Sequence, residues 1–340
     1  MDKNYPKLLI LCTVSAGLDA IAEVHRRGYP IEGLVGLSPD SVNPRLISGY
    51  TDIHPFADKI NVKSYYSSTY SLTSNSDREL FSRLEFDLIW VCGWQRLVPA
   101  WLIELAQLGV LGGHGSPDGI AGGRGRSPQN WALLLGCSQF DLALFLISEG
   151  IDDGPVISHR SFYYRPYDDI QISYYRASLA MADMVCELLD CPDNIQNAKL
   201  QDRPGFYYPQ RRPEDGSIDW YQTMEFISRQ CRALTLPYPG IKSSIDGVTL
   251  TITECQPFDD QLDGDPGQIS NCFSSGDFLV NVMDGRLLVR GWEASDCSWV
   301  PSYQSRLVSV PWRKQLEVIV NRHILKNPEQ PISNRILRQL

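Results

Sequence analysis

Leu8-Leu-Ile-Leu-Cys-Thr-Val14 is a continuous apolar run that predicts a buried strand of a parallel sheet. The turn Ser15-Ala-Gly-Leu-Asp19 follows it and leads into a helical pattern that ends near Arg27. A second apolar run covers Ile31-Glu-Gly-Leu-Val-Gly-Leu37. Strand, helix and strand at this spacing predict a βαβ unit, and therefore an α/β domain with a mainly parallel sheet.

The same alternation continues further along the chain. Ser127-Pro128 begins a predicted helix that ends at Gly136, because serine caps a helix and proline suits its first position. The other elements predicted for this domain are helices at 77–84 and 169–189 and strands at 86–92, 140–148 and 155–162.

The second half of the chain has a different pattern. Residues 199–213 are rich in Pro, Arg and Gln and are interpreted as a linker between a first domain, 1–198, and a second domain, 214–340. A helix at 221–234 is followed by short alternating runs at 248–253, 278–282 and 286–291, which predict a smaller β-rich domain. The polar tail after Pro328 is expected to be loose.

Composition and cysteine usage exclude several classes of protein. With 340 residues, 43% hydrophobic and 21% charged, the chain can bury a sizeable core, and no apolar run approaches the roughly 20 residues of a membrane span. The start, residues 1–14, has the charge and apolar order of a signal peptide, but the turn and helix that follow favour a buried strand. Nine cysteines without a Cys-x-x-Cys pair indicate reduced thiols, no zinc site and a cytoplasmic location.

The charge balance argues against a nucleic-acid partner. The formal net charge is -9, and residues 206–340 hold 14 Lys and Arg against 16 Asp and Glu. A protein that grips a polyanion normally carries a basic face, because phosphate neutralisation supplies much of the affinity.

A glycine-rich loop holds the leading catalytic candidate. It reads Gly109-Val-Leu-Gly-Gly-His-Gly-Ser-Pro-Asp-Gly-Ile-Ala-Gly-Gly-Arg-Gly-Arg-Ser-Pro128 and contains no Gly-x-Gly-x-x-Gly spacing, so a dinucleotide site is not indicated. His114 follows a strand end, where open α/β sheets bind ligands. A lone histidine is usually structural, and Asp152 and Asp153 lie in a Gly-flanked turn where Asp is common for turn chemistry alone.

Several motifs together resemble the folate-dependent formyltransferases, the family of methionyl-tRNA formyltransferase and the amino-sugar N-formyltransferases. They are His114-x-Ser116, then Arg124-Gly-x-x-Pro-x-x-Trp-Ala132, then Gly150-Ile-Asp-Asp-Gly154, with Arg211–Trp220 and Arg232–Gly240 further on. The match is collinear over most of residues 8–255. The resemblance implies a Rossmann-like, mainly parallel sheet with a C-terminal β-rich domain.

The resemblance implies the chemistry as well. In the family an amine attacks the formyl group of N10-formyltetrahydrofolate, with no metal. His114 would accept the amine proton, since an imidazole suits this role at neutral pH, and Asp152 would orient the ring. The pterin-receiving residues implied by the resemblance are Trp94, Gln95, Arg96, Leu97 and Val98, together with Gly150 and Ile151.

The chain departs from the family at one catalytic position. The family's asparagine falls two residues before the histidine, and this chain has Gly112 there. Such a donor stabilises the charge on the formyl oxygen and is typically worth about 2.7–4 kcal/mol. Three hypotheses follow: backbone N–H groups of residues 112–115 replace it, a side chain such as Asn130 or Ser116 replaces it, or the enzyme is slow or has changed chemistry.

The acceptor is predicted to be a small molecule. Arg124 and Arg126, with Asn130, would hold an anionic substrate such as a nucleotide-linked sugar, the alternative for the arginines being a surface salt bridge. The stretches Ile47–Asp52 and Trp94–Pro99 are similar to the sugar-modifying branch. We therefore expect formylation of an amine on a nucleotide-linked or nonulosonic-type sugar for surface glycans.

Other functions remain open at this stage. The alternatives are a methionyl-tRNA formyltransferase, a formyltetrahydrofolate hydrolase that transfers the formyl group to water, and a catalytically silent binding protein. No membrane partner is expected, nucleic acid is disfavoured, and a homodimer is considered.

Overall fold

The chain forms two compact units in a computed structural model that describes residues 5–40, 47, 49–202 and 204–340. The first unit comprises residues 1–124, 141–162 and 174–205, and the second comprises 125–140, 163–173 and 206–340. Ser48 of the Ile47–Asp52 stretch and residues 1–4 of the N-terminal stretch lie outside the described residues.

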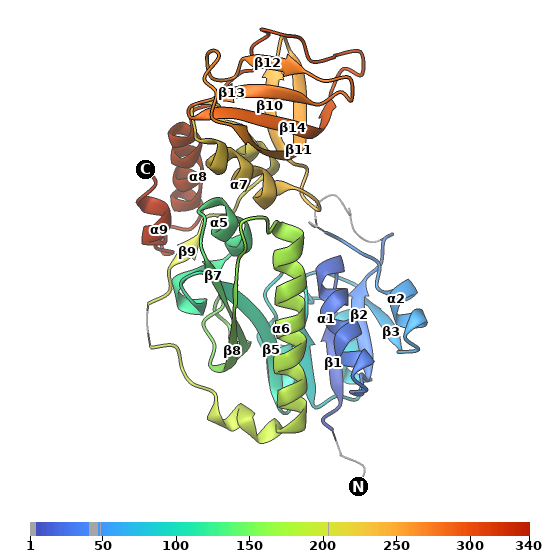
Figure 1. Cartoon of the computed structure of the whole chain (residues 1–340). Coiled ribbons are helices and arrows are strands. Elements are labelled where there is room, and N and C mark those ends of the chain that lie inside the picture. Colours follow the sequence, from blue (N-terminus) through green and yellow to red (C-terminus); the bar gives the residue numbers. More distant parts are fainter. Residues whose placement is uncertain (1–4, 41–46, 48, 203) are drawn as a thin grey trace. The chain divides into compact units, whose positions relative to one another are not determined.

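The first unit is built on a seven-stranded sheet of order β3-β2-β1-β4-β5-β7-β8 (Figure 1). Strands β3, β2, β1, β4 and β5 run parallel, and β7 runs antiparallel to β5. The continuous apolar runs become strands because both faces of this sheet are covered. The strands are β1 Leu8–Leu11, β2 Gly33–Leu37, β3 Ser64–Ser67, β4 Leu88–Val91, β5 Gly109–Ser116, β7 Gln139–Leu146 and β8 Val156–Tyr163.

Helices cover both faces of the sheet. Helices α1 and α6 pack together on one face, where the Ser178 hydroxyl donates to the Ala16 carbonyl at 3.1 Å, and Figure 1 shows them side by side. The helices of this part of the chain are α1 Ser15–Arg26, α2 His54–Lys59, α3 Asn75–Ser82, α4 Ala100–Leu105 and α6 Ile170–Asp190.

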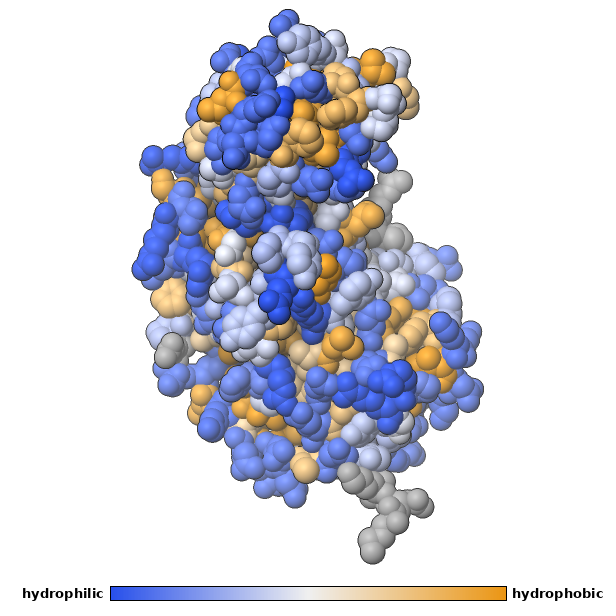
Figure 2. Space-filling view, viewed as in Figure 1, coloured by the Kyte–Doolittle hydropathy of each residue, from blue (hydrophilic) through white to orange (hydrophobic). Residues whose placement is uncertain are grey.

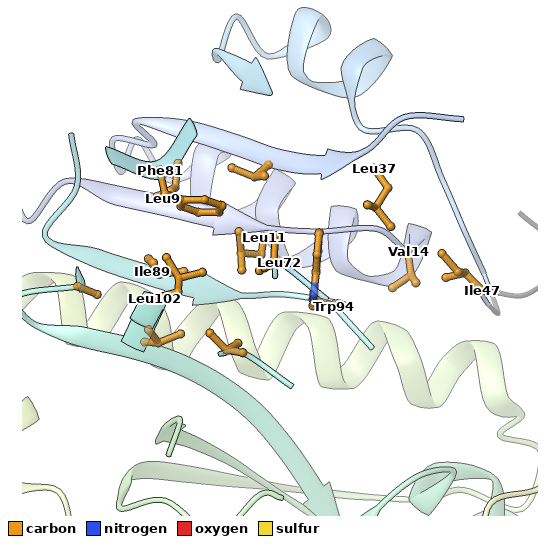
Figure 3. Packing of buried hydrophobic residues seen from close by; sticks show 14 residues of the cluster. Leu9, Leu11, Val14, Leu37, Ile47, Leu72, Phe81, Ile89, Trp94 and Leu102 are labelled. Carbon is orange, nitrogen blue, oxygen red and sulfur yellow. The ribbon is translucent and has the colours of Figure 1, made fainter. Parts of the chain in front are cut away.

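The opposite face of the sheet carries a continuous apolar cluster (Figure 3). Leu9 and Leu11 of β1 belong to this cluster with Phe81 of α3 and Leu102 of α4, and Val110 of β5 extends it toward His114 of the same strand. Because side chains alternate along a strand, residues 112 and 114 of β5 lie on the same face as Val110. His114 thus lies on the same face of the sheet as the apolar cluster.

The second unit contains a five-stranded antiparallel sheet of order β10-β11-β14-β13-β12. Helix α7 begins at the Thr223 cap, whose hydroxyl accepts from the Phe226 N–H, and packs on β11. The strands are β10 Ile241–Ile245, β11 Val248–Asp259, β12 Ile269–Cys272, β13 Phe278–Val282 and β14 Gly285–Ala294; the helices are α5 Pro128–Leu134, α7 Met224–Leu234, α8 Trp312–Lys326 and α9 Asn334–Leu337. The prediction of an α/β sheet and a smaller β-rich part is therefore confirmed.

The compact units differ from the predicted boundaries at α5. This helix was assigned to the first domain, yet it packs on α7, and the Asn130 side chain donates to the Ala233 carbonyl at 2.7 Å. The indole N–H of Trp131 likewise donates to the Pro209 carbonyl at 2.8 Å. Tertiary hydrogen bonds, rather than position in the sequence, place α5 in the second unit.

The expectation of a loose tail is wrong for residues 332–337. Ser333 caps α9 by accepting from the Arg335 N–H, and Ile336 is fully buried. The His323 ring nitrogen Nε2 also contacts the Gln330 carbonyl at 3.0 Å.

Within the described residues no helix has the length and apolar character to cross a bilayer. Figure 2 shows hydrophilic residues over much of the visible face of each unit, with apolar residues scattered among them. All nine cysteines lie in the described part of the chain and are free thiols.

Candidate active site

His114 stands at the carboxyl edge of the parallel sheet. Strand β4 ends at Val91, which pairs with Gly112, whereas β5 continues beside β7, where His114 pairs with Ala143. The histidine therefore lies two residues beyond the end of β4, in the crevice position where open α/β sheets bind ligands.

The His114 ring faces the carboxylate of Asp152, as the sequence analysis predicted. Nδ1 of the ring lies 3.5 Å from Oδ2 of Asp152, and the two side chains are 11% and 22% exposed. Asp152 belongs to the turn between β7 and β8 and has a φ of 49°, in the left-handed region that Asp tolerates better than most residues. Residues 38 positions apart in the sequence thus form one polar centre.

The second ring nitrogen of His114 also has a partner. Nε2 lies 2.8 Å from the carbonyl oxygen of Gly123, which follows the 3₁₀ turn Ile120–Gly122. The ring thus has Nε2 at hydrogen-bond distance from the Gly123 carbonyl and Nδ1 at ion-pair distance from the Asp152 carboxylate. For Nε2 to receive a proton from a substrate, the Gly123 carbonyl has to give way.

Gly112 leaves no room for an amide side chain. A Cβ at Gly112 would lie 2.8 Å from Cζ of the Phe145 ring and 2.9 Å from Cγ1 of Ile147. Two apolar side chains therefore fill the place that a side chain at position 112 would take.

The two side chains proposed as replacements have hydrogen bonds of their own. The Ser116 hydroxyl donates to the Gly119 carbonyl at 2.7 Å and accepts from the Asp118 N–H at 3.1 Å, and Ser116 is fully buried. Asn130 is 2% exposed and donates to Ala233 within the second unit. Both side chains are therefore already engaged in hydrogen bonds within the protein.

The backbone of β5 offers a different kind of donor. Among the strands of the described residues, only β7 pairs with β5 beyond Gly112. Hydrogen bonds to one antiparallel neighbour use only every second residue's N–H, and the others point to the opposite side. Gly113 and Gly115 flank His114 in this segment and expose the backbone most readily.

The residues predicted to receive the pterin divide into buried and exposed groups. Trp94 and Val98 are 6% and 5% exposed and belong to the apolar cluster in Figure 3, whereas Leu97 is 60% exposed. The Gln95 N–H donates to the Tyr70 hydroxyl at 2.9 Å. The Arg96 guanidinium lies 4.9 Å from the centre of the Tyr70 ring.

Gly150 and Ile151 lie in the same turn as Asp152. A Cβ at Gly150 would lie 1.9 Å from Oδ2 of Asp153, whose other carboxylate oxygen accepts from the Ser148 hydroxyl. A side chain at position 150 would therefore displace the Asp153 carboxylate, and Ile151 is half-buried next to Asp152.

Arg124 is a buried side chain rather than a surface anion donor. It is 9% exposed, and its Nη2 donates to Oε1 of Gln201 at 2.7 Å. Arg126 is exposed and belongs to the second unit, as does Asn130. The three residues predicted to hold an anionic substrate thus have three different environments.

Gln201 is the site residue that sequence reasoning missed. Its Nε2 donates to the carbonyls of Asp152 and Gly154, both at 2.9 Å. Gln201 lies in the segment interpreted as a linker, where a glutamine among prolines and arginines carries no signal of a tertiary role.

Two thiols at the same edge of the sheet are not available as nucleophiles. Burial raises the pKa of the Cys12 thiol to about 12 and raises the pKa of Cys92 well above its ordinary value. Both follow the ends of parallel strands, yet at neutral pH neither forms the reactive thiolate. Among the described residues no group of three or more His, Cys, Asp or Glu side chains is arranged to hold a metal ion.

Comparisons with known proteins relate the chain to formyltransferases. Residues 211–301 match the family model described as formyl transferase, C-terminal domain. The chain is similar to methionyl-tRNA formyltransferase of Geobacter metallireducens, with 32% identity over 197 residues, covering 55% of this chain and 62% of that protein. The chain therefore aligns with less than two thirds of that relative's length.

Solved structures share the fold. HypX from Aquifex aeolicus superimposes with a TM-score of 0.62 at 18% identity, covering 94% of this chain and 50% of that one. An N-formyltransferase from Helicobacter canadensis, solved with folinic acid and dTDP-3-aminofucose, gives a TM-score of 0.56 at 14% identity, covering 85% of this chain and 100% of that one.

Proposed function

We propose that this chain, which belongs to the folate-dependent formyltransferase family, transfers the formyl group of N10-formyltetrahydrofolate to the amine of a sugar. The observation that carries the proposal is the His114–Asp152 pair, whose Nδ1 and Oδ2 atoms are 3.5 Å apart at the carboxyl edge of the sheet. Such a pair suits a reaction in which an attacking amine has to lose a proton.

The proton transfer assigns a role to each member of the pair. When the amine nitrogen bonds to the formyl carbon, it acquires a positive charge and its proton moves to His114. The imidazolium that forms is stabilised by the facing carboxylate of Asp152. As the bond from the formyl carbon to N10 of the folate breaks, His114 would pass the proton it holds to N10, which restores the free imidazole.

The negative charge that develops on the formyl oxygen needs donors at a fixed place. The hypothesis that Asn130 or Ser116 supplies one has little support, because both side chains are already engaged. We favour the hypothesis that backbone N–H groups supply the donors. The donors are assigned to residues 113–115 rather than to Gly112, because among the described strands β5 pairs there with β7 alone.

Two residues of the loop after β4, Leu97 and Trp94, fit the binding of the flat pterin ring of the folate. Exposed Leu97 offers apolar surface at the edge that also carries His114, since β4 and β5 are adjacent parallel strands. The indole nitrogen of Trp94 is buried and has no acceptor within the described residues, so a ligand acceptor reaching it would pair an otherwise unsatisfied donor. When bound, the folate supplies an activated formyl group.

A sugar acceptor is supported by charge and by one structural neighbour. The net charge of -9 and the near-neutral residues 206–340 lack the basic surface expected for gripping tRNA. The Helicobacter canadensis enzyme of the same fold is solved with dTDP-3-aminofucose. Surface glycan biosynthesis in the cytoplasm is the proposed setting, with a small, nucleotide-linked sugar as the acceptor.

Methionyl-tRNA formylation is the second candidate. It is favoured by the activity named for relatives such as the Geobacter metallireducens protein. Both candidates use the same His114–Asp152 chemistry and differ only in the acceptor.

A single set of assays separates the candidates. Purified protein is incubated with formyl-labelled folate and either a panel of nucleotide-linked amino sugars or methionyl-tRNA, and the products are analysed by mass spectrometry. We expect one formyl group on a sugar amine. Label on methionyl-tRNA alone would replace the first proposal with the second, and label released as formate without any amine would indicate a hydrolase.

A further inference from the structure

The Gln201 side chain joins two segments that contact His114. Its two amide protons go to the carbonyl oxygens of Asp152 and Gly154, each at 2.9 Å, and its carbonyl accepts from Arg124 at 2.7 Å. A primary amide has two N–H donors, so both are used within one turn.

The backbone next to Gln201 is anchored to the start of β8. Lys199 and Val156 exchange two backbone hydrogen bonds of 2.8 Å and form an isolated antiparallel bridge. Gln201 is two residues from this anchor, so its side chain reaches the turn from a fixed position.

The turn that receives these bonds has an unusual backbone. Asp152 has a φ of 49°, and a Cβ at Gly154 would lie 1.8 Å from the Leu146 carbonyl. A conformation that is sparsely populated in isolation persists when surrounding contacts determine it. The two bonds from Gln201 flank Asp153 and fix both sides of this conformation.

Arg124 extends the connection to the other partner of the histidine. It follows Gly123, whose carbonyl lies 2.8 Å from Nε2 of His114. Its guanidinium packs against Gly205, where a Cβ would lie 2.4 Å from Nη1. The two groups that face the ring nitrogens, the Gly123 carbonyl and the Asp152 carboxylate, are therefore linked through Arg124 and Gln201.

We infer that Gln201 is a positioning residue for the His114–Asp152 pair, acting through the backbone of the Asp152 turn and through Arg124. The expected loss of kcat rests on the proposed function, whereas the expected loosening of the Asp152 turn rests on the contacts alone. Within the described residues the hydrogen bonds of the Gln201 side chain go to backbone carbonyls and to Arg124. Its effect is therefore on the position of the Asp152 carboxylate relative to the His114 ring. A misplacement of about 1 Å can cost roughly 10²-fold in rate.

Two substitutions separate the donors from the acceptor. Gln201→Met removes both functions at nearly the same length, and Gln201→Glu keeps an acceptor for Arg124 but loses the donors to the turn. We expect both variants to lower kcat by about 10- to 100-fold with little change in KM for the folate. Gln107→Met is the matched control, because Gln107 is exposed and precedes β5 at its other end.

A double substitution tests whether Gln201 acts through Asp152. If it does, Gln201→Met adds little to the loss already caused by Asp152→Asn, because the geometry it protects no longer serves catalysis. Losses that multiply would overturn the positioning role, since they would show that Gln201 acts independently of Asp152.

Hydrogen–deuterium exchange tests the same inference without any turnover. In Gln201→Met the amides of residues 149–154 should exchange at least tenfold faster than in the unmodified protein, while those of β1, and all amides of the Gln107→Met control, stay unchanged. Unchanged exchange at residues 149–154 would overturn the inference even if the enzyme is active. If the unmodified protein forms no formylated product, the proposed function fails and the exchange result still decides the role of Gln201.

Discussion

At residue 112 the structure shows that neighbouring side chains occupy the space a larger residue would need. The resemblance places the family's asparagine at this position, and the sequence alone left three hypotheses for what replaces it. Phe145 and Ile147 fill the space into which a side chain at Gly112 would extend. Because the filling residues lie more than 30 positions away in the sequence, no local pattern could have shown it.

Replacing Gly112 with Asn should therefore disrupt packing rather than restore a donor. Forcing extra atoms into a filled space typically costs about 1–3 kcal/mol, so Gly112→Asn should lower the free energy of unfolding, measured by urea denaturation. Phe145→Ala frees part of this space, and the double variant should be less destabilised than the sum of the two single changes. Unfolding of Gly112→Asn at the urea concentration of the unmodified protein would contradict this packing.

Asp152 carries the functional prediction at the residue scale. Asp152→Asn keeps the shape of the side chain but removes the charge that stabilises an imidazolium at His114, so kcat should fall by about 10²-fold or more. The thermal midpoint should stay close to that of the unmodified protein. Asp153→Asn, in the same turn, is the matched control, and an equal loss of rate in both variants would make Asp152 only a turn residue.

At the element scale, strands were more predictable than turns. The apolar runs predicted at 31–37 and 86–92 contain β2 and β4, because both faces of these strands are buried and the signal is continuous. The site turn between β7 and β8 was located from its glycines, but its attachment to Gln201 was invisible because it depends on a distant segment. Pairing of His114 with Asp152 likewise came from the resemblance and not from spacing.

One helix was missed although its signal is present. The buried apolar residues of α8 are Trp312, Leu316, Ile319 and Val320, which recur at helical spacing. No element was predicted between residue 291 and the tail after Pro328, although this spacing indicates a helix.

Helix α3 supplies the prediction for stability and pH. Asp77 is fully buried and accepts from Ser68, Thr69 and Ser74, forming the capping box of this helix. Burial alone raises the pKa of Asp77, but these hydrogen bonds outweigh it and hold the pKa below its ordinary value of 3.8. The carboxylate thus stabilises the fold at pH values above about 4, the unfolded value.

This stabilisation should disappear as the pH falls below about 4, through the lowered pKa of the folded state. Asp77→Asn should cost on the order of 1–3 kcal/mol at pH 7, and the difference from the unmodified protein should shrink at pH 3. Urea denaturation at both pH values measures it, with Asp58→Asn on the exposed face of α2 as the control. A difference that stays constant between pH 7 and pH 3 would contradict the assignment to the carboxylate.

At the scale of the whole molecule, two compact units with different sheets are present, and the boundary placed at residues 199–213 stays a prediction. The contents of the units could not be predicted from order along the chain, because residues 125–140 and 163–173 belong with the second unit. The sugar acceptor was predicted from the resemblance of residues 47–52 and 94–99 to the sugar-modifying branch and from the charge of the chain, and it stays a prediction.

The most direct test of the central claim follows the formyl carbon in a single turnover. Enzyme in excess over 13C-formyl folate is mixed with the accepted amine, and the label is followed by NMR as it leaves the folate. We predict that the label appears as a formamide with the unmodified protein, and that His114→Gln slows this transfer by at least about 10²-fold while the folate still binds. Transfer at the same rate in both proteins would contradict the claim that His114 takes the proton from the attacking amine.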